Sequence, residues 1–175
     1  TYKEFEQRIN TIKKYILKDE LRDQFYFGVD ASEIASFETY CQIFACIFAG
    51  KCFVPTNLNY PKERIEFLLA NTGIKTVLTH SESPKFESDF IKINNVQLVN
   101  TKLFSTDVVS ELDCKDYPDD NHAYILFTSG STGFPKGVPI TRGNLFAFAE
   151  TFLSFGYEVN ESDRFIQMFD YTFDL

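Results

Sequence analysis

An apolar run leads into a loop of small residues and one lysine at residues 124–138, and this stretch constrains the fold more than any other. Ile125–Phe127 predicts a buried strand, and the loop behind it holds three Gly and four Ser or Thr side chains around Lys136. Gly permits close backbone approach, free N–H groups can point at an anion, and Lys supplies positive charge. A helix-like pattern from about Thr141 would complete a strand–loop–helix unit that binds phosphate. A nucleotide is therefore the first ligand to consider.

Two other interpretations of this loop are weaker. A Walker A loop needs Ser or Thr directly after its Lys to hold Mg²⁺, whereas Gly137 follows Lys136 and Pro135 precedes it. A flexible surface linker would share the Ser, Thr and Gly content, but linkers are rarely framed by a strand and a helix. The sequence therefore favours a phosphate-binding loop that is not of the Walker type.

The same stretch closely resembles the signature loop of adenylate-forming enzymes, the superfamily of acyl-CoA synthetases, luciferases and peptide-synthetase adenylation domains. Their pattern Y-x-x-[FY]-T-S-G-[ST]-T-G-x-P-K-G-V is met at every fixed position. The resemblance implies that the loop holds the β- and γ-phosphates of ATP, with Mg²⁺ bridging them. The phosphate-binding residues that it implies are Thr128, Ser129, Gly130, Ser131, Thr132, Gly133 and Lys136. It identifies no metal ligand here, and it implies that the family's catalytic Lys lies outside this chain.

A second stretch carries the resemblance further. Residues 48–64 look like the family's K-A-G-G-A-Y-V-P-[IL]-D-P-x-Y-P-x-x-R. Three departures are visible: Lys51 replaces the second Gly, Asn57 replaces Asp, and Leu58 replaces the second Pro. We expect this stretch to be scaffold that positions a strand and a helix.

The end of the chain carries the third resemblance. Phe173-Asp174-Leu175 is similar to the start of F-D-x-S in amino-acid-activating members, which implies that Asp174 binds the ammonium group of the substrate. A carboxylate suits that role because a charge-assisted pair offsets the desolvation of both groups. Asp170 could be mistaken for this residue, but alignment of Arg164 and Gln167 with the family's R-x-x-Q favours Asp174.

The resemblance implies a reaction in two steps. A carboxylate attacks the α-phosphate of ATP, giving an acyl adenylate and pyrophosphate, and the acyl group then passes to a thiol of coenzyme A or of a carrier-protein phosphopantetheine. Ser131, where many fatty-acyl and aryl members have Thr, favours an amino acid together with Asp174, as in peptide-synthetase adenylation domains or D-alanine–carrier-protein ligases. An acyl-CoA synthetase-type ligase, a P-loop-type phosphotransferase and a non-catalytic adenylation-like module remain alternatives.

Segments of strand and helix character alternate along the chain. Helices are predicted at about 2–18, 32–49, from 61, and 143–155, and strands at 24–29, 52–54, 76–79, 91–93, 97–99, 124–127 and 164–168. This order predicts an α/β fold with a mostly parallel sheet and flanking helices. The resemblance implies that residues 1–175 are the N-terminal part of an adenylation domain, without the rest of the domain or its C-terminal lid. We therefore expect the isolated chain to be inactive.

Composition excludes several classes of partner. The net charge is −8 with no cluster of Lys and Arg, so neither nucleic acid nor an anionic membrane is an expected partner. No apolar run approaches the length of a membrane span. Exposed apolar surface on a partial domain would favour self-association.

The cysteines indicate the compartment. The four Cys stand at 41, 46, 52 and 114 without a C-x-x-C pair, and both His are distant from any paired Cys, so neither zinc nor a disulfide framework is supported. Cys41 and Cys46 lie in an apolar helical run, which favours buried free thiols and a cytoplasmic protein.

Overall fold

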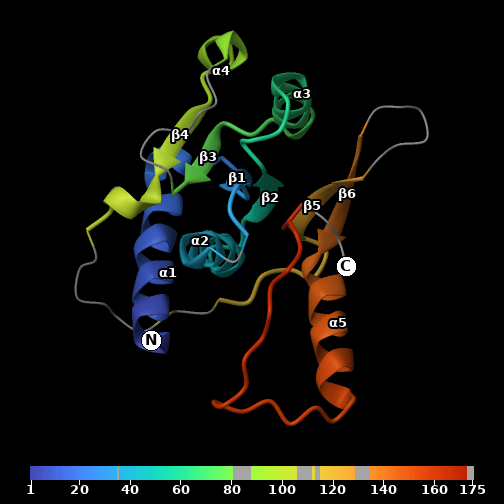
Figure 1. Ribbon diagram of the computed structural model, residues 1–175. Helices are drawn as coiled ribbons and strands as arrows, with labels where there is room; N and C mark the ends of the chain where they lie inside the picture. The colour runs from blue at the N-terminus through green and yellow to red at the C-terminus, as the bar shows by residue number, and fades with distance from the viewer. Residues whose placement is uncertain (35, 81–87, 106–111, 113–114, 129–134, 173–175) are drawn as a thin grey trace.

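A mostly parallel sheet forms the centre of the molecule (Figure 1). The computed structural model describes residues 1–34, 36–80, 88–105, 112, 115–128 and 135–172. Within them the strands are β1 (Tyr26–Asp30), β2 (Cys52–Thr56), β3 (Thr76–Thr79), β4 (Gln97–Asn100), β5 (His122–Thr128) and β6 (Lys136–Thr141). Their order in the sheet is β4-β3-β1-β2-β5-β6, and all neighbours are parallel except the antiparallel pair β5 and β6. The predicted α/β fold is confirmed.

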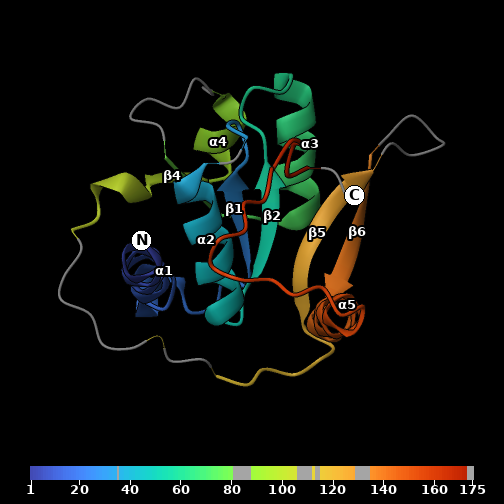
Figure 2. The ribbon, with the colours of Figure 1, turned by 60° about the horizontal axis from the view of Figure 1, so that its bottom comes forward.

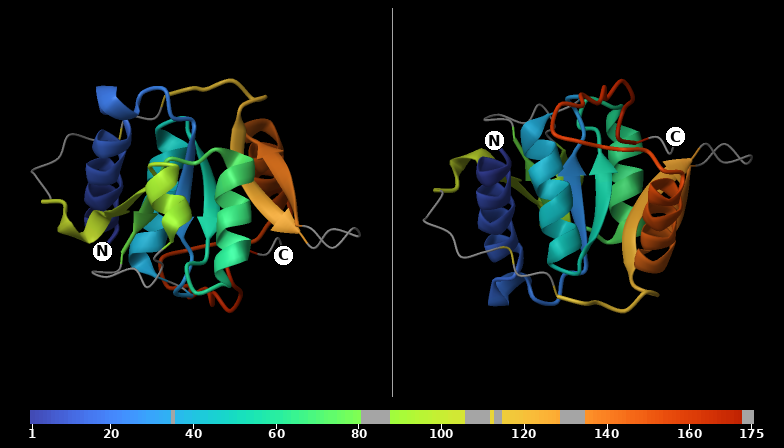
Figure 3. Two further views of the ribbon diagram at one scale, coloured as in Figure 1. Left: turned by 90° about the horizontal axis from the view of Figure 1, so that it is seen from above. Right: turned by 90° about the horizontal axis from the view of Figure 1, so that it is seen from below.

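Helices cover both faces of this sheet (Figure 3). They are α1 (Tyr2–Ile16), α2 (Phe37–Phe48), α3 (Lys62–Thr72), α4 (Asp89–Ile93) and α5 (Arg142–Ser154), with short 3₁₀ turns at Asp19–Leu21 and Thr101–Leu103. Helices α1, α2 and α5 lie on one face, and α3 and α4 lie on the other. Adjacent residues of β2 show why two layers form, since Phe53 packs with the α1–α2 core and Val54 packs with the α3 core. Successive side chains of a strand point to opposite faces, so a central strand needs a helix on each side.

Two predicted helix starts are confirmed by their caps. The Thr1 side chain accepts a hydrogen bond from the Glu4 backbone N–H at 3.2 Å, and the Glu4 carboxylate reaches back to the chain terminus. Thr141 and Asn144 form the same reciprocal capping box at the start of α5. Each box satisfies backbone donors that the first turn of a helix leaves unpaired.

The second helix begins later than its pattern predicts. Residues 32–49 were expected to be helical with Ser32 at the start, but α2 begins at Phe37. Ser32 instead turns the chain at the end of β1, where its backbone N–H donates to the Asp30 carboxylate at 3.0 Å. The other end agrees with expectation: Gly50 follows α2 with φ of +67°, a conformation that costs Gly little.

Two predicted strands are wrong. Residues 91–93 belong to the short helix α4, capped by the Ser88 hydroxyl, which accepts from the Phe90 N–H at 3.1 Å. Residues 164–168 form no strand in the described part of the chain, where they have no neighbouring strand with which to pair. A short apolar run alone therefore does not make a strand.

A buried ion pair ties the first two helices to the far end of the sheet. The Arg8 guanidinium of α1 donates from Nε and Nη2 to the Glu38 carboxylate of α2 at 2.8–3.1 Å. It also donates to the backbone carbonyls of Thr101 and Phe104, which follow β4. Both side chains are nearly excluded from solvent, at 11% and 6% exposure. Because each polar atom depends on the others, removal of one partner leaves a charge buried without compensation.

Three cysteines are buried free thiols, as predicted for two of them. Cys41, Cys46 and Cys52 are buried and unpaired, and burial raises the pKa of the Cys41 and Cys52 thiols from 9.0 to about 12. Burial raises the pKa of Cys46 as well.

These thiols predict a loss of stability at alkaline pH. The unfolded chain releases its thiol protons above about pH 8.5 while the folded protein still holds them. The contribution is therefore full below that pH and decreases as the pH rises toward about 12. Urea midpoints measured from about pH 8 to pH 10.5 should fall, and Cys41→Ala with Cys52→Ala should flatten that fall. An equally steep decline in the double variant would assign the effect to other groups.

Candidate functional site

The two ends of the predicted phosphate loop meet at the outer edge of the sheet (Figure 2). The β5–β6 hairpin pairs Thr128 with Lys136 and Phe127 with Gly137. Side chains directly opposite on an antiparallel pair lie on the same face, so the Thr128 and Lys136 side chains leave the sheet from neighbouring positions on one face. The remaining predicted loop residues, Ser129, Gly130, Ser131, Thr132 and Gly133, lie outside the described residues.

The loop end of this hairpin lies at the edge of the sheet where ligands bind in α/β folds. β5 runs parallel to β2, which runs parallel to β1, so Thr128 lies at the carboxyl edge with Asp30 and Thr56. Pockets in such sheets form beyond the carboxyl ends of the strands. The position of the two ends of the loop therefore agrees with a phosphate-binding role.

The expected strand–loop–helix unit is wrong in one respect. The loop is followed by β6, and α5 begins only at Arg142, at the opposite end of that strand. The N-terminus of α5 therefore lies at the other end of β6 from the two ends of the loop, and Lys136 supplies a positive charge at those ends. The period-two pattern of Val138 and Ile140 is the missed signal for β6. Pro139 is tolerated there because β6 is an edge strand.

Lys136 is available to a ligand. It is exposed, and its side chain forms no hydrogen bond or ion pair with another residue that the structure describes. An exposed ammonium group on the same face as a hydroxyl, at the carboxyl edge of the sheet, suits an anionic oxygen. The chemistry of this pair of side chains therefore fits a phosphate.

Gly137 allows the hairpin to close tightly behind Lys136. A β-carbon at this position would lie 3.1 Å from the Ile125 side chain and 3.2 Å from the Phe127 ring. Those distances are shorter than ordinary van der Waals contacts, so a larger residue would move the neighbouring rings or the strand. The residue that excludes a Walker A loop thus has a packing role in this hairpin.

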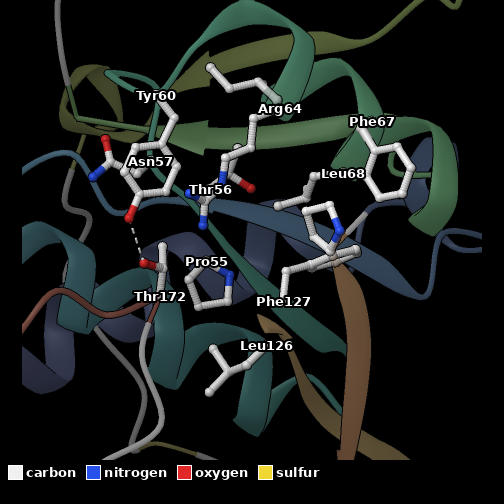
Figure 4. Close-up of a pocket in the computed structure, with 12 residues that line it drawn as sticks. Pro55, Thr56, Asn57, Tyr60, Arg64, Phe67, Leu68, Leu126, Phe127 and Thr172 are labelled. Carbon is white, nitrogen blue, oxygen red and sulfur yellow. Dashed lines mark hydrogen bonds between the residues drawn. The ribbon is translucent and has the colours of Figure 1, made fainter. Parts of the chain in front are cut away.

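A narrow apolar cleft opens between β2 and β5 next to the hairpin (Figure 4). The two strands share the register pair Phe53 and Tyr124 and then separate. The cleft has an empty volume of about 420 Å³, part of it open to solvent. Its walls come from β2, α3, β5 and the C-terminal segment, and they include Pro55, Tyr60, Arg64, Leu126, Pro135 and Thr172.

Asp170, the residue that sequence comparison set aside, is already engaged. Its carboxylate accepts hydrogen bonds from Asn57 Nδ2 at 3.0 Å, from the Tyr60 hydroxyl at 3.2 Å and from the Thr172 N–H at 2.9 Å. Asp174, the predicted amine-binding residue, lies outside the described residues. Sequence reasoning missed Asn57 and Tyr60, because nothing local in the chain indicates a contact with a residue more than one hundred positions away.

Arg142, for which no catalytic role was predicted, is a packing residue. It is 5% exposed, it donates to the Ile47 carbonyl at 2.9 Å, and its guanidinium lies over the Tyr117 and Phe146 rings. These contacts fasten the start of α5 to the end of α2. They leave the side chain far from the opening of the hairpin, which is at the other end of β6.

The described residues offer no metal site. No group of three or more His, Cys, Asp and Glu side chains among them is placed to hold a metal ion. Mg²⁺ is thus supported by the family resemblance alone, and its ligands are not found among these residues. In the same part of the chain, no helix is long and apolar enough to cross a membrane.

The mostly parallel α/β sheet, with Thr128 and Lys136 paired at the loop end of an edge hairpin, is similar to the fold of a solved adenylate-forming enzyme. The family model described as AMP-binding enzyme matches residues 1–175, and the chain belongs to this family.

Relatives and solved structures agree with this assignment. The chain is 28% identical to zwittermicin A synthase ZmaJ of Bacillus cereus, an alignment that covers 100% of this chain and 32% of the relative. It is 32% identical to nonribosomal peptide synthetase GRA1 of Gibberella zeae, covering 100% of this chain and 2% of the relative. The fold is similar to o-succinylbenzoate CoA synthetase of Bacillus subtilis, solved with its acyl-adenylate intermediate, with a TM-score of 0.71, 23% identity, and coverage of 93% and 41%. The chain thus spans less than half of each of these proteins.

Proposed function

We propose that these residues form the phosphate-binding part of an ATP-dependent ligase that activates an amino acid as an acyl adenylate. The observation that carries the proposal is the register pairing of Thr128 with Lys136 at the carboxyl edge of the sheet, in a chain of the AMP-binding family. The Lys136 side chain has no partner among the described residues. The family assignment supports ATP as the nucleotide. Mg²⁺ would accompany the phosphates, held by groups outside the described residues.

The chemistry requires little of the protein besides placement and charge. A carboxylate attacks the α-phosphate without a general base, because it is already an anion with a free lone pair. The protein must hold the two reactants in line and neutralise the charge that leaves with pyrophosphate. Lys136 supplies that charge at the β- and γ-phosphates, with Thr128 as a hydroxyl donor and the loop between them as the source of backbone N–H groups.

The proposal that the substrate is an amino acid depends on two sequence positions and on the relatives. Ser131 and Asp174 match the amino-acid-activating pattern, and GRA1 is a nonribosomal peptide synthetase. We propose Asp174 as the partner of the substrate ammonium group and a carrier-protein phosphopantetheine or coenzyme A as the thiol acceptor. An acyl-CoA synthetase-type ligase is the alternative within the same family.

Four further assignments accompany this proposal. Residues 1–175 would be the N-terminal part of the adenylation domain, and the chain would be inactive alone, in the cytoplasm. Large apolar side chains on α5 and behind it are exposed, among them Phe148, Phe155 and Ile166 at 67%, 69% and 81%. Such a surface would favour self-association of the isolated chain.

Pyrophosphate exchange tests the proposed substrate. The full-length protein that contains these residues is incubated with ATP, labelled pyrophosphate and a panel of amino, fatty and aryl acids. We expect label to return to ATP only with one or a few amino acids. Exchange that depends on a fatty or aryl acid would instead support an acyl-CoA synthetase-type ligase. A lack of exchange with every acid would favour a non-catalytic module.

A further inference from the structure

Four polar side chains join the C-terminal segment to the corner between β2 and α3. Asp170 Oδ2 accepts from Asn57 Nδ2 at 3.0 Å and from the Tyr60 hydroxyl at 3.2 Å. The Tyr60 hydroxyl also shares a hydrogen bond of 2.9 Å with Thr172 Oγ1, drawn as a dashed line in Figure 4. We call Asn57, Tyr60, Asp170 and Thr172 the corner clamp.

The Asn57 amide is oriented for this contact by its own turn. Its Oδ1 accepts the backbone N–H of Asn59 at 3.0 Å, so its Nδ2 is the atom that faces Asp170. An aspartate at position 57 would keep the bond from Asn59, because the oxygen that accepts it is retained. It would replace the donor with an oxygen, and two carboxylates would then face each other. Asn57 and Asp170 are therefore complementary as a pair.

Tyr60 is held from the other side. The Arg64 guanidinium lies over the Tyr60 ring at 4.1 Å from its centroid, and in Figure 4 both side chains extend from α3 and its preceding turn toward the cleft. A stacked ring with two hydrogen bonds at its hydroxyl has little freedom to move. The clamp thus gives Thr172 a fixed place on the wall of the cleft that it shares with Tyr60 and Asn57.

The clamp is also where the C-terminal segment meets the domain. Residues 155–169 are exposed except for Gln167, whereas 170–172 are half-buried. Tyr171 adds a ring contact with Tyr40 of α2, with centroids 5.5 Å apart. A chain advances at most about 3.6 Å per residue, so whatever fixes Thr172 limits the reach of a residue two positions further on.

We propose that Asn57 and Tyr60 are positioning residues that act through Asp170 to place the segment leading to Asp174, and so set the affinity for the substrate. This inference rests on the proposed amino-acid ligase. Loss of the clamp should raise the KM for the amino acid and leave the KM for ATP nearly unchanged, because Lys136 is held independently by the β5–β6 hairpin.

The test uses the pair's own complementarity in the full-length protein. Asn57→Asp should raise the KM for the amino acid by about tenfold or more at about pH 8, the factor expected when a hydrogen bond to a charged group is lost. The double variant Asn57→Asp with Asp170→Asn should recover most of that loss, because the amide then donates from the other side. Asn59→Asp is the matched control: it adds the same charge two residues away, at an exposed position where the amide faces the Ser32 carbonyl and not Asp170.

A second variant and a second readout make the outcome decisive. Tyr60→Phe keeps the stack on Arg64 and removes both hydroxyl bonds, so it should act on the amino-acid KM as Asn57→Asp does. Hydrogen exchange at the Thr172 amide, which donates to Asp170 at 2.9 Å, reports the clamp without requiring activity. Faster exchange in Asn57→Asp that the double variant reverses would support the clamp even if the ligase proposal fails. Unchanged exchange in Asn57→Asp, or equal rises in the KM for ATP and for the amino acid, would overturn the inference.

Discussion

Replacing Lys136 with alanine is expected to lower kcat/KM for ATP in pyrophosphate exchange by about 100- to 1000-fold. This is the range found when a preorganised group that stabilises developing negative charge is removed. The ammonium group stands beside Thr128 and has no partner among the described residues, so nothing else on the hairpin can replace its charge. The assay uses the full-length protein at several ATP concentrations, so that losses in kcat and in KM are separated.

Two further measurements complete this prediction. Lys3→Ala, an exposed change on α1, removes the same charge away from the hairpin and should leave exchange within about twofold. In calorimetry on the 175-residue chain, any ATP binding should weaken with Lys136→Ala. Wild-type exchange by the Lys136→Ala protein would show that this loop does not hold phosphate.

Removing either partner of the Arg8–Glu38 pair is expected to destabilise the fold by about 3–5 kcal/mol, the range for a buried charge left unpaired. Arg8→Ala leaves the Glu38 carboxylate without its counter-charge and the Phe104 carbonyl without a donor, whereas the Thr101 carbonyl keeps the Phe104 N–H. Urea unfolding followed by circular dichroism measures the change, provided that the slope of the transition is preserved.

Two further variants separate the effect of burying these side chains from the effect of their charge. Arg8→Met with Glu38→Leu together should cost less than either single change, because two apolar side chains leave no buried charge. Lys62→Ala is the control: its ion pair with Glu66, at 3.8 Å and half-exposed, should contribute less than about 1 kcal/mol. Single Arg8 or Glu38 variants as mild as Lys62→Ala would show that the pair does not support the fold.

Local sequence patterns predicted several helix and strand bounds of this molecule. Thr1 and Thr141 cap helices that begin close to their predicted starts, and Gly50 follows the helix that was predicted to end at about residue 49. The β3 strand has its predicted bounds. Each of these signals acts within a few residues, so the sequence alone contains it.

The failures occur where a neighbour decides the structure. The Ile91–Ile93 run has an alternating pattern, but Ser88 caps a helix there and β4 takes the sheet position next to β3. β6 was missed because the glycine and proline around Val138 are typical of loops, although an edge strand tolerates both.

The candidate site shows the same division. The loop motif predicted a phosphate cradle, and the structure brings Thr128 and Lys136 together at the carboxyl edge. Asn57 was expected to be scaffold, and its bond to Asp170 could not be predicted from residues 113 positions apart. The binding of the substrate ammonium group by Asp174 remains a prediction from sequence. Asp170 is engaged by the corner clamp.

The identity of the phosphate that leaves ATP tests the proposed chemistry most directly. The full-length protein is given ATP labelled at the γ-phosphate, together with the amino acid that supports exchange, and the labelled products are separated. Attack at the α-phosphate releases pyrophosphate and leaves the adenylate, so label is expected in pyrophosphate. Label in orthophosphate, with ADP as the second product, would contradict an adenylate-forming site at Lys136 and support a phosphotransferase or an ATPase.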